Sequence, residues 1–395
     1  MSTLAVRLVL LAAAVAGAVL RPFRIPPWVV PVVVCLAGLA SGALPRGRVV
    51  GWLSPLGGAV AFLLLAVPFS ALLDQMGFFE QMSLALGGRR RVGLELWLLG
   101  AATTAVLNLD AAVVLLTPLF VRVARSRHLD ETAFAFQPVL LASLASSLLP
   151  VSNLTNLVVA GRIDVHALAF LANLGLPTVA AVAVGYLRWR SVFAPGCPSP
   201  VATGSGDPAI LWRGGLAVAA VLAGFLVGPA LGLPLWAVVA AGDVALVAVT
   251  RSVPLRSVPL GTAAIAAALA VLAGAAAASV DIGPLLRATT GPLGAAADSV
   301  VAVLAADGSN NLPAILFLLP SAGPATGTTV WAILLGINVG PAFLVTGSLA
   351  GLLWMDAARQ AGVQVRAADF SRRGIQVAGP AFVAATAVLV FQHLL

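Results

Sequence analysis

Long apolar stretches constrain this chain more than any other feature. One of them, residues 328–354, is longer than the about 20 apolar residues that a helix needs to cross a bilayer. Of all residues, 61% are hydrophobic and 9% are charged, whereas a soluble domain carries about 25% charged residues. The sequence therefore predicts an all-α polytopic protein of the cytoplasmic membrane, surrounded by the lipid bilayer, with little room for a soluble domain.

About ten transmembrane spans and two re-entrant hairpins account for the apolar pattern. The hairpins are predicted at residues 92–120 and 283–320, because both stretches carry polar residues at their centres. The first span has the composition of a signal peptide, but no small-residue cleavage site precedes Arg21, so a span is preferred. The spans are predicted at residues 4–20, 27–45, 50–73, 135–160, 165–187, 209–230, 234–250, 257–280, 326–353 and 374–394.

The arginines test this topology. With the arginine cluster at residues 89–91 in the cytoplasm, 17 of the 22 arginines fall in cytoplasmic loops and 5 fall outside. The positive-inside rule requires this asymmetry, and turning a hairpin into a full span would remove it. Both termini are then predicted outside. The chain has no lysine, and we interpret its net charge of +8 as topology information rather than nucleic-acid binding.

A segment rich in Pro, Gly and Ser, residues 191–208, divides the chain. We expect it to be a flexible cytoplasmic linker. It would join a first transmembrane repeat, residues 1–190, to a second one, residues 209–395. Each repeat has the order span, span, span, hairpin, broken span, span. Because the first starts outside and the second starts inside, they form a predicted inverted-topology repeat, as in many secondary transporters.

Four polar breaks interrupt the apolar stretches, namely one hairpin tip and one broken span in each half. Tips that enter from opposite sides would meet the broken spans near the midplane, where free helix N-termini, amides and hydroxyls hold an oxygen-rich solute. The alternative is kinked structural helices whose polar groups only join neighbouring helices. The candidate substrate- or ion-binding residues are Asn108, Asp110, Ser152, Asn153, Thr155, Asn156, Ser309, Asn310, Asn311, Asn338, Thr346 and Ser348.

Three intramembrane carboxylates are candidates for proton coupling. Asp110 and Asp307 lie nearest the two hairpin tips, and Asp243 lies within the span 234–250. A carboxylate at membrane depth is costly, so it indicates function by default. As alternatives, Asp110 and Asp307 each cap a helix, and Asp243 pairs with a neighbouring polar group.

Patterns typical of metal sites and enzymes are missing from the sequence. The cysteines, Cys35 and Cys197, form no CxxC pair, and the three histidines have no metal-ligand spacing. No break combines Ser, His and Asp, so an intramembrane enzyme is not expected. We predict neither a metal nor a cofactor. A passive channel stays open as an alternative, because a sequence does not show whether two gates open together.

Five stretches resemble the ArsB-type arsenite/antimonite permease family. That family lies in a wider ion transporter superfamily, which includes sodium–dicarboxylate symporters and NhaD-type Na+/H+ antiporters. The order of the stretches matches the family, and together they cover most of the chain. The stretches are LLDQMGFFE (72–80), NLDAAVVLLTP (108–118), LPVSNLTNLV (149–158), NNLPAIL (310–316) and NVGPAFLVTGSLAGLLW (338–354).

The resemblance implies export of arsenite or antimonite at the polar breaks, coupled to proton entry and sometimes assisted by a soluble arsenite-activated ATPase. Arsenite at neutral pH is an uncharged trihydroxide, which needs hydrogen bonds, and no break contains Arg or Cys. The tip reads NLDAA where the family has NDGAA, and Leu344 and Val345 replace its Thr-Pro pair. These differences leave a second hypothesis open, Na+- or H+-coupled transport of a dicarboxylate or other small anion. The oligomeric state is not determined, and a homodimer is compatible with the sequence.

Overall fold

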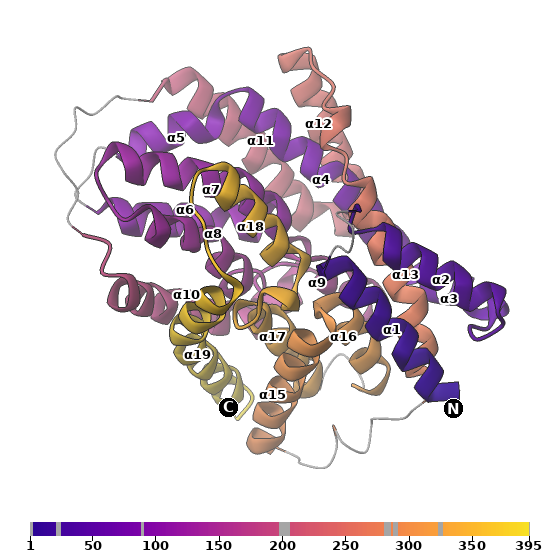
Figure 1. The fold of residues 1–395 in the computed structure, drawn as a ribbon. Helices are drawn as coiled ribbons and strands as arrows, with labels where there is room; N and C mark the ends of the chain where they lie inside the picture. Colours follow the sequence, from indigo (N-terminus) through magenta and orange to yellow (C-terminus); the bar gives the residue numbers. More distant parts are fainter. Residues whose placement is uncertain are drawn as a thin grey trace.

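The computed structural model describes residues 3–20, 25–87, 91–196, 206–279, 286, 291–322 and 327–394. These residues form helices and connecting segments, with no β-strand among them. Figure 1 shows the helices packed into one bundle, with both chain ends at its lower edge. Residues 197–205 of the predicted linker and five arginines lie outside the described residues, the arginines being Arg21, Arg24, Arg89, Arg90 and Arg287.

The first half of the chain contains both kinds of interruption that the sequence predicts. The hairpin consists of α6 and α7, and the broken span consists of α8 and α9. A short helix α5 precedes the hairpin, where no span was predicted. The helices are α1 (Thr3–Leu20), α2 (Val29–Ala40), α3 (Val49–Leu53), α4 (Gly57–Gln75), α5 (Phe78–Gly87), α6 (Val92–Leu107), α7 (Leu109–Ser126), α8 (Glu131–Leu144), α9 (Leu154–Ile163) and α10 (Ala167–Phe193).

The second half follows the same order without counterparts of α3 and α5 among the described residues. Its hairpin consists of α15 and α16, and its broken span consists of α17 and α18. The helices are α11 (Pro208–Val227), α12 (Leu235–Thr250), α13 (Leu260–Ala277), α15 (Gly291–Ser309), α16 (Asn311–Leu318), α17 (Thr328–Val339), α18 (Leu349–Gln360) and α19 (Ala367–Gln392).

Within the described residues, 4 helical segments are long and apolar enough to cross a membrane, namely Ala167–Phe193, Pro208–Phe225, Leu255–Ala277 and Ala367–Gln392. Helix α10 illustrates why. It buries Phe170, Leu174 and Trp189 on one face, while Leu176 and Leu187 on other faces are more than half exposed. A helix that is apolar all round belongs in lipid or in a large core. Further apolar helices are shorter. They include helices of the hairpins and broken spans, but also α1, α2, α4 and α12, which lie in segments predicted as full spans. The number of ten spans stays a prediction.

Helices α10 and α19 pack side by side in opposite directions and connect the two halves of the chain. Arg188 Nε donates to the carbonyl of Gln376 at 3.2 Å near one end, and Gln392 Nε2 donates to the carbonyl of Ala172 at 3.2 Å near the other. Ala181 on α10 is fully buried, as are several alanines of α19. Small side chains let helix backbones approach closely where the surrounding lipid is as apolar as the side chains.

Aromatic side chains fix α8 between α10 and α18. Trp189 Nε1 donates to the carbonyl of Ala133 at 2.8 Å, and Trp354 Nε1 donates to the carbonyl of Ala135 at 2.6 Å. The ring of Phe136 lies 4.7 Å from that of Trp354. A buried indole N–H needs an acceptor, so these bonds hold the first turn of α8 at a defined depth beside α18.

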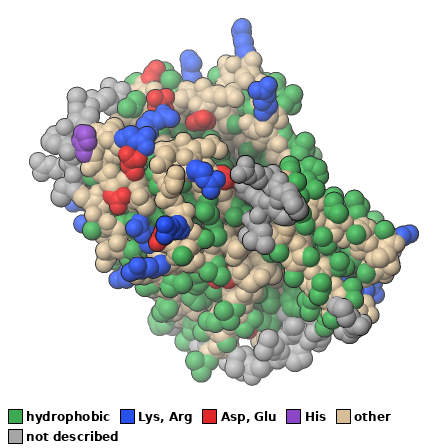
Figure 2. Space-filling view, in the orientation of Figure 1, with side chains coloured by type: hydrophobic (Ala, Val, Ile, Leu, Met, Phe, Trp, Pro, Cys, Tyr) green, Lys and Arg blue, Asp and Glu red, His purple; other side chains and the backbone are tan. Residues whose placement is uncertain are grey.

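Charged side chains are unevenly distributed over the surface. Figure 2 shows them gathered at the upper left of the molecule, where α5, α6, α7 and α18 lie in Figure 1, while the lower right is mostly hydrophobic. Arg122 and Arg125 on α7 and Arg359 on α18 belong to this charged end. It is the end that the arginine pattern assigns to the cytoplasm.

Candidate functional site

Each hairpin turns at an asparagine with positive φ. Asn108 between α6 and α7 has φ 124°, and Asn310 between α15 and α16 has φ 79°. The side-chain oxygen of each accepts a hydrogen bond from the backbone N–H two residues later, Asp110 N at 2.8 Å and Leu312 N at 3.4 Å. The asparagine therefore ends one arm and caps the next. Sparsely populated backbone conformations of this kind cluster at functional sites.

The two broken spans share one backbone geometry. In the first, extended Leu149 and Asn153 (φ −134° and −147°) flank the 3₁₀ turn Pro150–Ser152. In the second, extended Leu344 and Ser348 (φ −126° and −151°) flank the turn Val345–Gly347. Asn153 Oδ1 then accepts from Thr155 N at 3.2 Å, and Ser348 Oγ accepts from Gly351 N at 3.4 Å. Each span thus stops and restarts at a capped helix N-terminus.

The N-termini of the four helices that follow the hairpin tips and the breaks, α7, α16, α9 and α18, meet at one small cavity of about 30 Å³. It has room for about one or two water molecules. Helix α13 closes its side with Thr262, Ala266 and Leu269. The other lining residues are the first residues of α7, α9, α16 and α18 and the caps of the last three: Leu109, Asp110, Asn153, Leu154, Thr155, Asn310, Asn311, Leu312, Ser348 and Leu349.

The electrostatics of this cavity follow from its lining. Four helix N-termini bring free N–H groups and the positive ends of helix dipoles to its wall. Asp110 is the acidic residue among the described lining residues, and no Arg, Lys, His or Cys is among them. Amides and hydroxyls of Asn153, Thr155 and Ser348 complete the wall. Such a site can hold an oxygen-rich solute, either neutral or anionic, through hydrogen bonds.

Asn338 of α17 binds the first broken span behind this cavity. Its Oδ1 accepts from Asn153 Nδ2 at 2.7 Å and from Thr155 Oγ1 at 3.1 Å. Its Nδ2 donates to Asn156 Oδ1 at 2.8 Å and to Ser147 Oγ at 3.1 Å. All five side chains are buried. Asn338 therefore joins the second half of the chain to the break in the first.

Asn156 and Ser152 complete the support of the first break. Asn156 Nδ2 donates to the carbonyls of Ser146 and Leu149 at 2.7 and 2.9 Å. Ser152 Oγ donates to the carbonyl of Ala105 on α6 at 2.7 Å, which ties the break to the hairpin. Backbone carbonyls freed by the break are thus satisfied within the protein, as membrane depth requires.

The second broken span is tied to its own hairpin. Asn310 Nδ2 donates to the carbonyl of Thr346 at 3.3 Å, and Thr346 Oγ1 donates to the carbonyl of Asp307 at 3.4 Å. The backbone N–H of Leu344 donates to the Asp307 carboxylate. Asp307 Oδ1 is buried and has no side-chain hydrogen-bond partner among the described residues.

The structure thus divides the sequence-predicted residues into groups. Asp110, Asn153, Thr155, Asn310, Asn311 and Ser348 line the cavity. Ser152, Asn156, Asn338, Asp307 and Thr346 lie behind it in the supporting bonds described above. Asn338, predicted as a binding residue, does not line the cavity, because both polar atoms of its amide are bonded to the first broken span.

Three predicted residues lie elsewhere. Asn108 caps α7, and its Nδ2 is buried without a hydrogen-bond partner in the described part of the chain. Ser309 donates to the carbonyl of Ala305 at 2.8 Å on its own helix. Asp243 belongs to α12, which packs against α4, and it does not line the cavity.

Sequence reasoning missed Thr262 and Ser147. Thr262 is a single hydroxyl in an apolar span, and nothing in its local sequence distinguishes it from a helix-bonded threonine. Ser147 lies near the start of the first break, in the polar run SLASSLLPVSN, so the length of that run was a usable signal.

Comparisons with known proteins define the family. A family model described as citrate transporter, CitMHS, matches residues 2–340. The chain belongs to this citrate transporter family. Within it, the chain is 30% identical to the arsenical pump membrane protein of Yersinia enterocolitica, over 91% of this chain and 92% of that one. It is 28% identical to the arsenical pump membrane protein of Escherichia coli K12, over 88% and 95% of the two chains.

A solved structure shares the fold. The YdaH transporter of Alcanivorax borkumensis superimposes with a TM-score of 0.57 at 17% identity, covering 87% of each chain. Together with the family and the apolar helices, this likeness confirms the predicted all-α membrane fold. As a member of the citrate transporter family with arsenical pump relatives, the chain is a multi-pass ion or anion transporter and not an enzyme.

Proposed function

We propose that the protein exports arsenite or antimonite from the cytoplasm by proton antiport. The observation that carries this proposal is the cavity where four capped helix N-termini converge. Its donors and acceptors suit an uncharged trihydroxide, because amides and hydroxyls can take either role in a hydrogen bond. The relatives named as arsenical pump membrane proteins support the choice of solute.

Proton coupling is assigned first to Asp110. Its carboxylate lines the cavity, so a proton and the solute would compete for the same space. Asp307 is the second candidate, because it is bonded to the backbone of the second break. Asp243 is the third, and its Oδ1 is buried without a hydrogen-bond partner among the described residues. Intramembrane carboxylates of this kind form proton relays in transporters.

Alternating access would be produced by movement of residues 1–190 against residues 209–395. A cavity of about 30 Å³ is too small for a solute with several heavy atoms. Loading therefore needs an opening on one side at a time. A soluble arsenite-activated ATPase and a second copy of this chain are further proposed partners, which co-purification and cross-linking in native membranes would detect.

The second candidate function is Na+- or H+-coupled transport of citrate, a dicarboxylate or another small anion. The family description favours it, and so does the convergence of four positive helix ends, because helix N-termini hold carboxylates in other transporters. The two functions differ in the charge of the solute, and both use the same cavity.

Flux measurements in vesicles distinguish them. A pH gradient is imposed across inside-out vesicles that contain this protein, with and without Na+. Uptake of arsenite, antimonite, citrate and succinate into the vesicles is then compared. We expect arsenite uptake that depends on the pH gradient and is indifferent to Na+. Uptake of citrate or succinate with no uptake of arsenite or antimonite would exclude the first proposal and support the second.

A further inference from the structure

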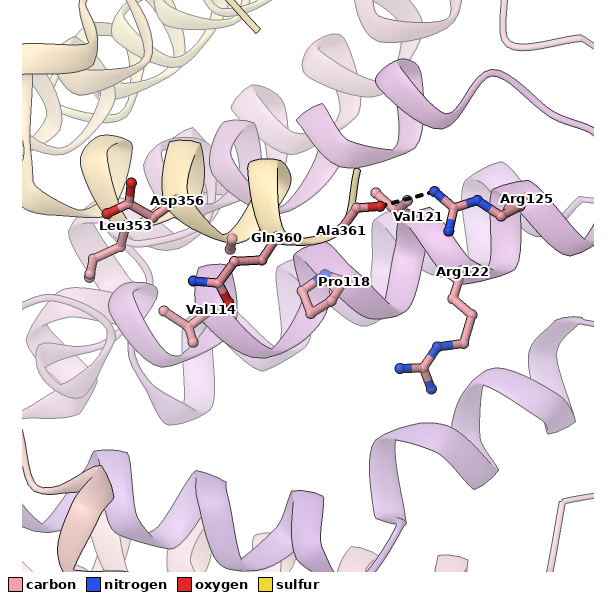
Figure 3. Close-up of a pocket in the computed structure, with 10 residues that line it drawn as sticks. Val114, Pro118, Val121, Arg122, Arg125, Leu353, Asp356, Gln360 and Ala361 are labelled. Atoms are coloured by element: carbon pink, nitrogen blue, oxygen red, sulfur yellow. Dashed lines mark hydrogen bonds between the residues drawn. The ribbon is translucent and has the colours of Figure 1, made fainter. Parts of the chain in front are cut away.

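A second, larger cavity lies between α7 and α18, at the charged end of the molecule. Its volume is about 570 Å³. Figure 3 shows Val114 and Leu353 at one end of it and Arg122 and Arg125 at the other. The described lining residues are Val114, Pro118, Val121, Arg122, Arg125, Leu353, Asp356, Ala357, Gln360 and Ala361. We refer to this cavity as the vestibule.

The vestibule is lined by two helices that also line the small cavity where the four helix N-termini meet. We refer to that small cavity as the midplane cavity. Asp110 of α7 lines the midplane cavity, and Val114, four residues later, lines the vestibule. On α18, Leu349 lines the midplane cavity, and Leu353, four residues later, lines the vestibule. Four residues are about one helical turn, or about 5.4 Å along the axis. The barrier between the two spaces is therefore about one turn thick on both helices.

The barrier consists of apolar side chains next to open space. Val114 is 43% exposed, although Val113, Leu116 and Thr117 on the same helix are fully buried. Leu353 is half-buried. An apolar constriction of this kind blocks water and polar solutes by dewetting and opens after a small displacement. Val114 and Leu353 are placed to act in this way.

The outer part of the vestibule is polar. Arg125 is held by Glu131 and by the carbonyl of Ala361, at 2.6 and 2.9 Å from Nη2. Asp356 lies instead beside Leu353 at the inner end (Figure 3), where it accepts from Arg359 at 3.2 Å. The remaining polar groups are Gln360 and Arg122, whose guanidinium interacts electrostatically with Asp74. A cation and an amide at the mouth favour entry of an oxygen-rich or anionic solute over a cation.

We propose that the vestibule is the entrance for the solute from the cytoplasm and that Val114 and Leu353 form its inner gate. The identity of the solute rests on the proposed function, whereas the position of the gate does not depend on it. Both helices start at the midplane cavity and end at the charged surface, so a solute that passes the gate reaches the wall made by Asp110 and Ser348.

Thiol labelling tests the entrance independently of any solute. Cys35 and Cys197 are replaced by Ala, and a single cysteine is introduced as Val114→Cys, Leu353→Cys or Leu176→Cys. Leu176 is the matched control, because it is 61% exposed on the apolar surface of α10. We expect a membrane-impermeant thiol reagent to modify the first two in inside-out vesicles and not in right-side-out vesicles. Modification only from the outside, or no more than for Leu176→Cys, would overturn the proposal.

Flux measurements test the gate. Val114→Trp and Leu353→Trp should lower flux by about tenfold or more, because a larger apolar side chain closes the constriction. Val114→Gly should allow downhill leakage without a pH gradient, and Leu176→Trp should leave flux unchanged. Equal flux in all four variants would exclude the gate. Labelling from the cytoplasmic face without any arsenite flux would refute the proposed function and leave the entrance in place.

Discussion

The two broken spans have the same backbone geometry but are held by different side chains. The first break, residues 145–153, is buried apart from Leu148 and is held by amide and hydroxyl bonds of 2.7–3.3 Å, several of them 2.7–2.9 Å. Several of these bonds converge on Asn338, which is almost 200 residues away in the sequence. In the second break, residues 340–348, Leu344 is 39% exposed, and the bonds are 3.3–3.4 Å long.

The carboxylates also differ between the halves. The residue three positions before the tip asparagine is Ala105 in the first hairpin and Asp307 in the second. The carbonyl of Ala105 accepts a hydrogen bond from the hydroxyl of Ser152 in the first break, and the carbonyl of Asp307 accepts one from the hydroxyl of Thr346 in the second. Only Asp307 adds a carboxylate that reaches the break backbone, while the first hairpin places its carboxylate, Asp110, in the cavity.

The difference indicates a division of roles. The first break is a fixed wall of the site, because its polar groups are paired with short bonds to the other half of the chain. The second break is the part that can rearrange, because its bonds are longer and one of its partners is a titratable carboxylate. This division is a hypothesis, and variants in both halves test it.

The largest expected effect is that of Asp110→Asn. The variant keeps the size of the side chain, replaces one carboxylate oxygen by an NH2 donor and cannot exchange a proton, so pH-driven transport should be abolished. Asp307→Asn should retain transport at a reduced rate, because it acts through the second break. Vesicle uptake with and without a pH gradient measures both. If Asp110→Asn keeps full pH-driven uptake, its role in coupling is refuted.

Asn338→Ala should have the next largest effect. It removes the Asn338 partner of Asn153 Nδ2, Thr155 Oγ1, Asn156 Oδ1 and Ser147 Oγ, and each orphaned buried group costs about 1–3 kcal/mol. The melting temperature of the purified protein should fall strongly and transport should be lost. The matched control is Thr346→Val in the second break, which removes one bond of 3.4 Å and should lower the melting temperature only slightly. Equal losses in both variants would contradict the fixed-wall hypothesis.

Gly347→Ala should impair transport while the protein still folds. A Cβ at this position would lie 2.7 Å from Pro341 Cα and 2.8 Å from Asp307 Oδ1, and overpacking of this kind costs about 1–3 kcal/mol. Relief requires both the Pro341 backbone and the Asp307 carboxylate to move. The corresponding position in the first break is Ser152, where Ser152→Ala adds no atom and loses the hydrogen bond to the Ala105 carbonyl and the one from Leu149 N. Uptake rates and gel-filtration profiles are measured for both variants. A lower uptake rate for Ser152→Ala than for Gly347→Ala would contradict the hypothesis that the second break is the part that rearranges.

The smallest effect is expected at the exposed pair between the predicted hairpin 92–120 and the predicted span 135–160. The Arg125 guanidinium is hydrogen-bonded to Glu131 and holds the pKa of that carboxyl below its usual range. A lowered folded-state pKa stabilises the fold above the ordinary glutamate value of about 4.3, and the contribution is lost as the pH falls through the lowered pKa. Glu131→Gln should therefore lower the melting temperature slightly at pH 7 and not at all in strong acid, because exposed pairs contribute little. A large loss at pH 7 would mean that the pair has a role beyond stability.

Much of the architecture is predictable from the order of residues alone. A bilayer leaves the backbone few options, so apolar runs predict helices and arginines predict their orientation. The tips and breaks stand out because Asn, Ser and Asp are rare within apolar runs, and Asn108, Asn310, Asn153 and Ser348 indeed cap the helices that restart there. The family resemblance followed from the same stretches.

Tertiary structure alone decided which of these polar groups line the cavity. Asn338 has the same local signal as Asn153, yet its amide is bonded to the opposite break. Thr262 lines the cavity because α13 packs beside α16, and the vestibule exists because α7 and α18 pack together at a separation of more than 200 residues. Local sequence encodes where a helix starts, stops and breaks, since caps and broken hydrogen bonds involve near neighbours. Which side chains meet across the bundle depends on the packing of distant helices, and no local pattern records that.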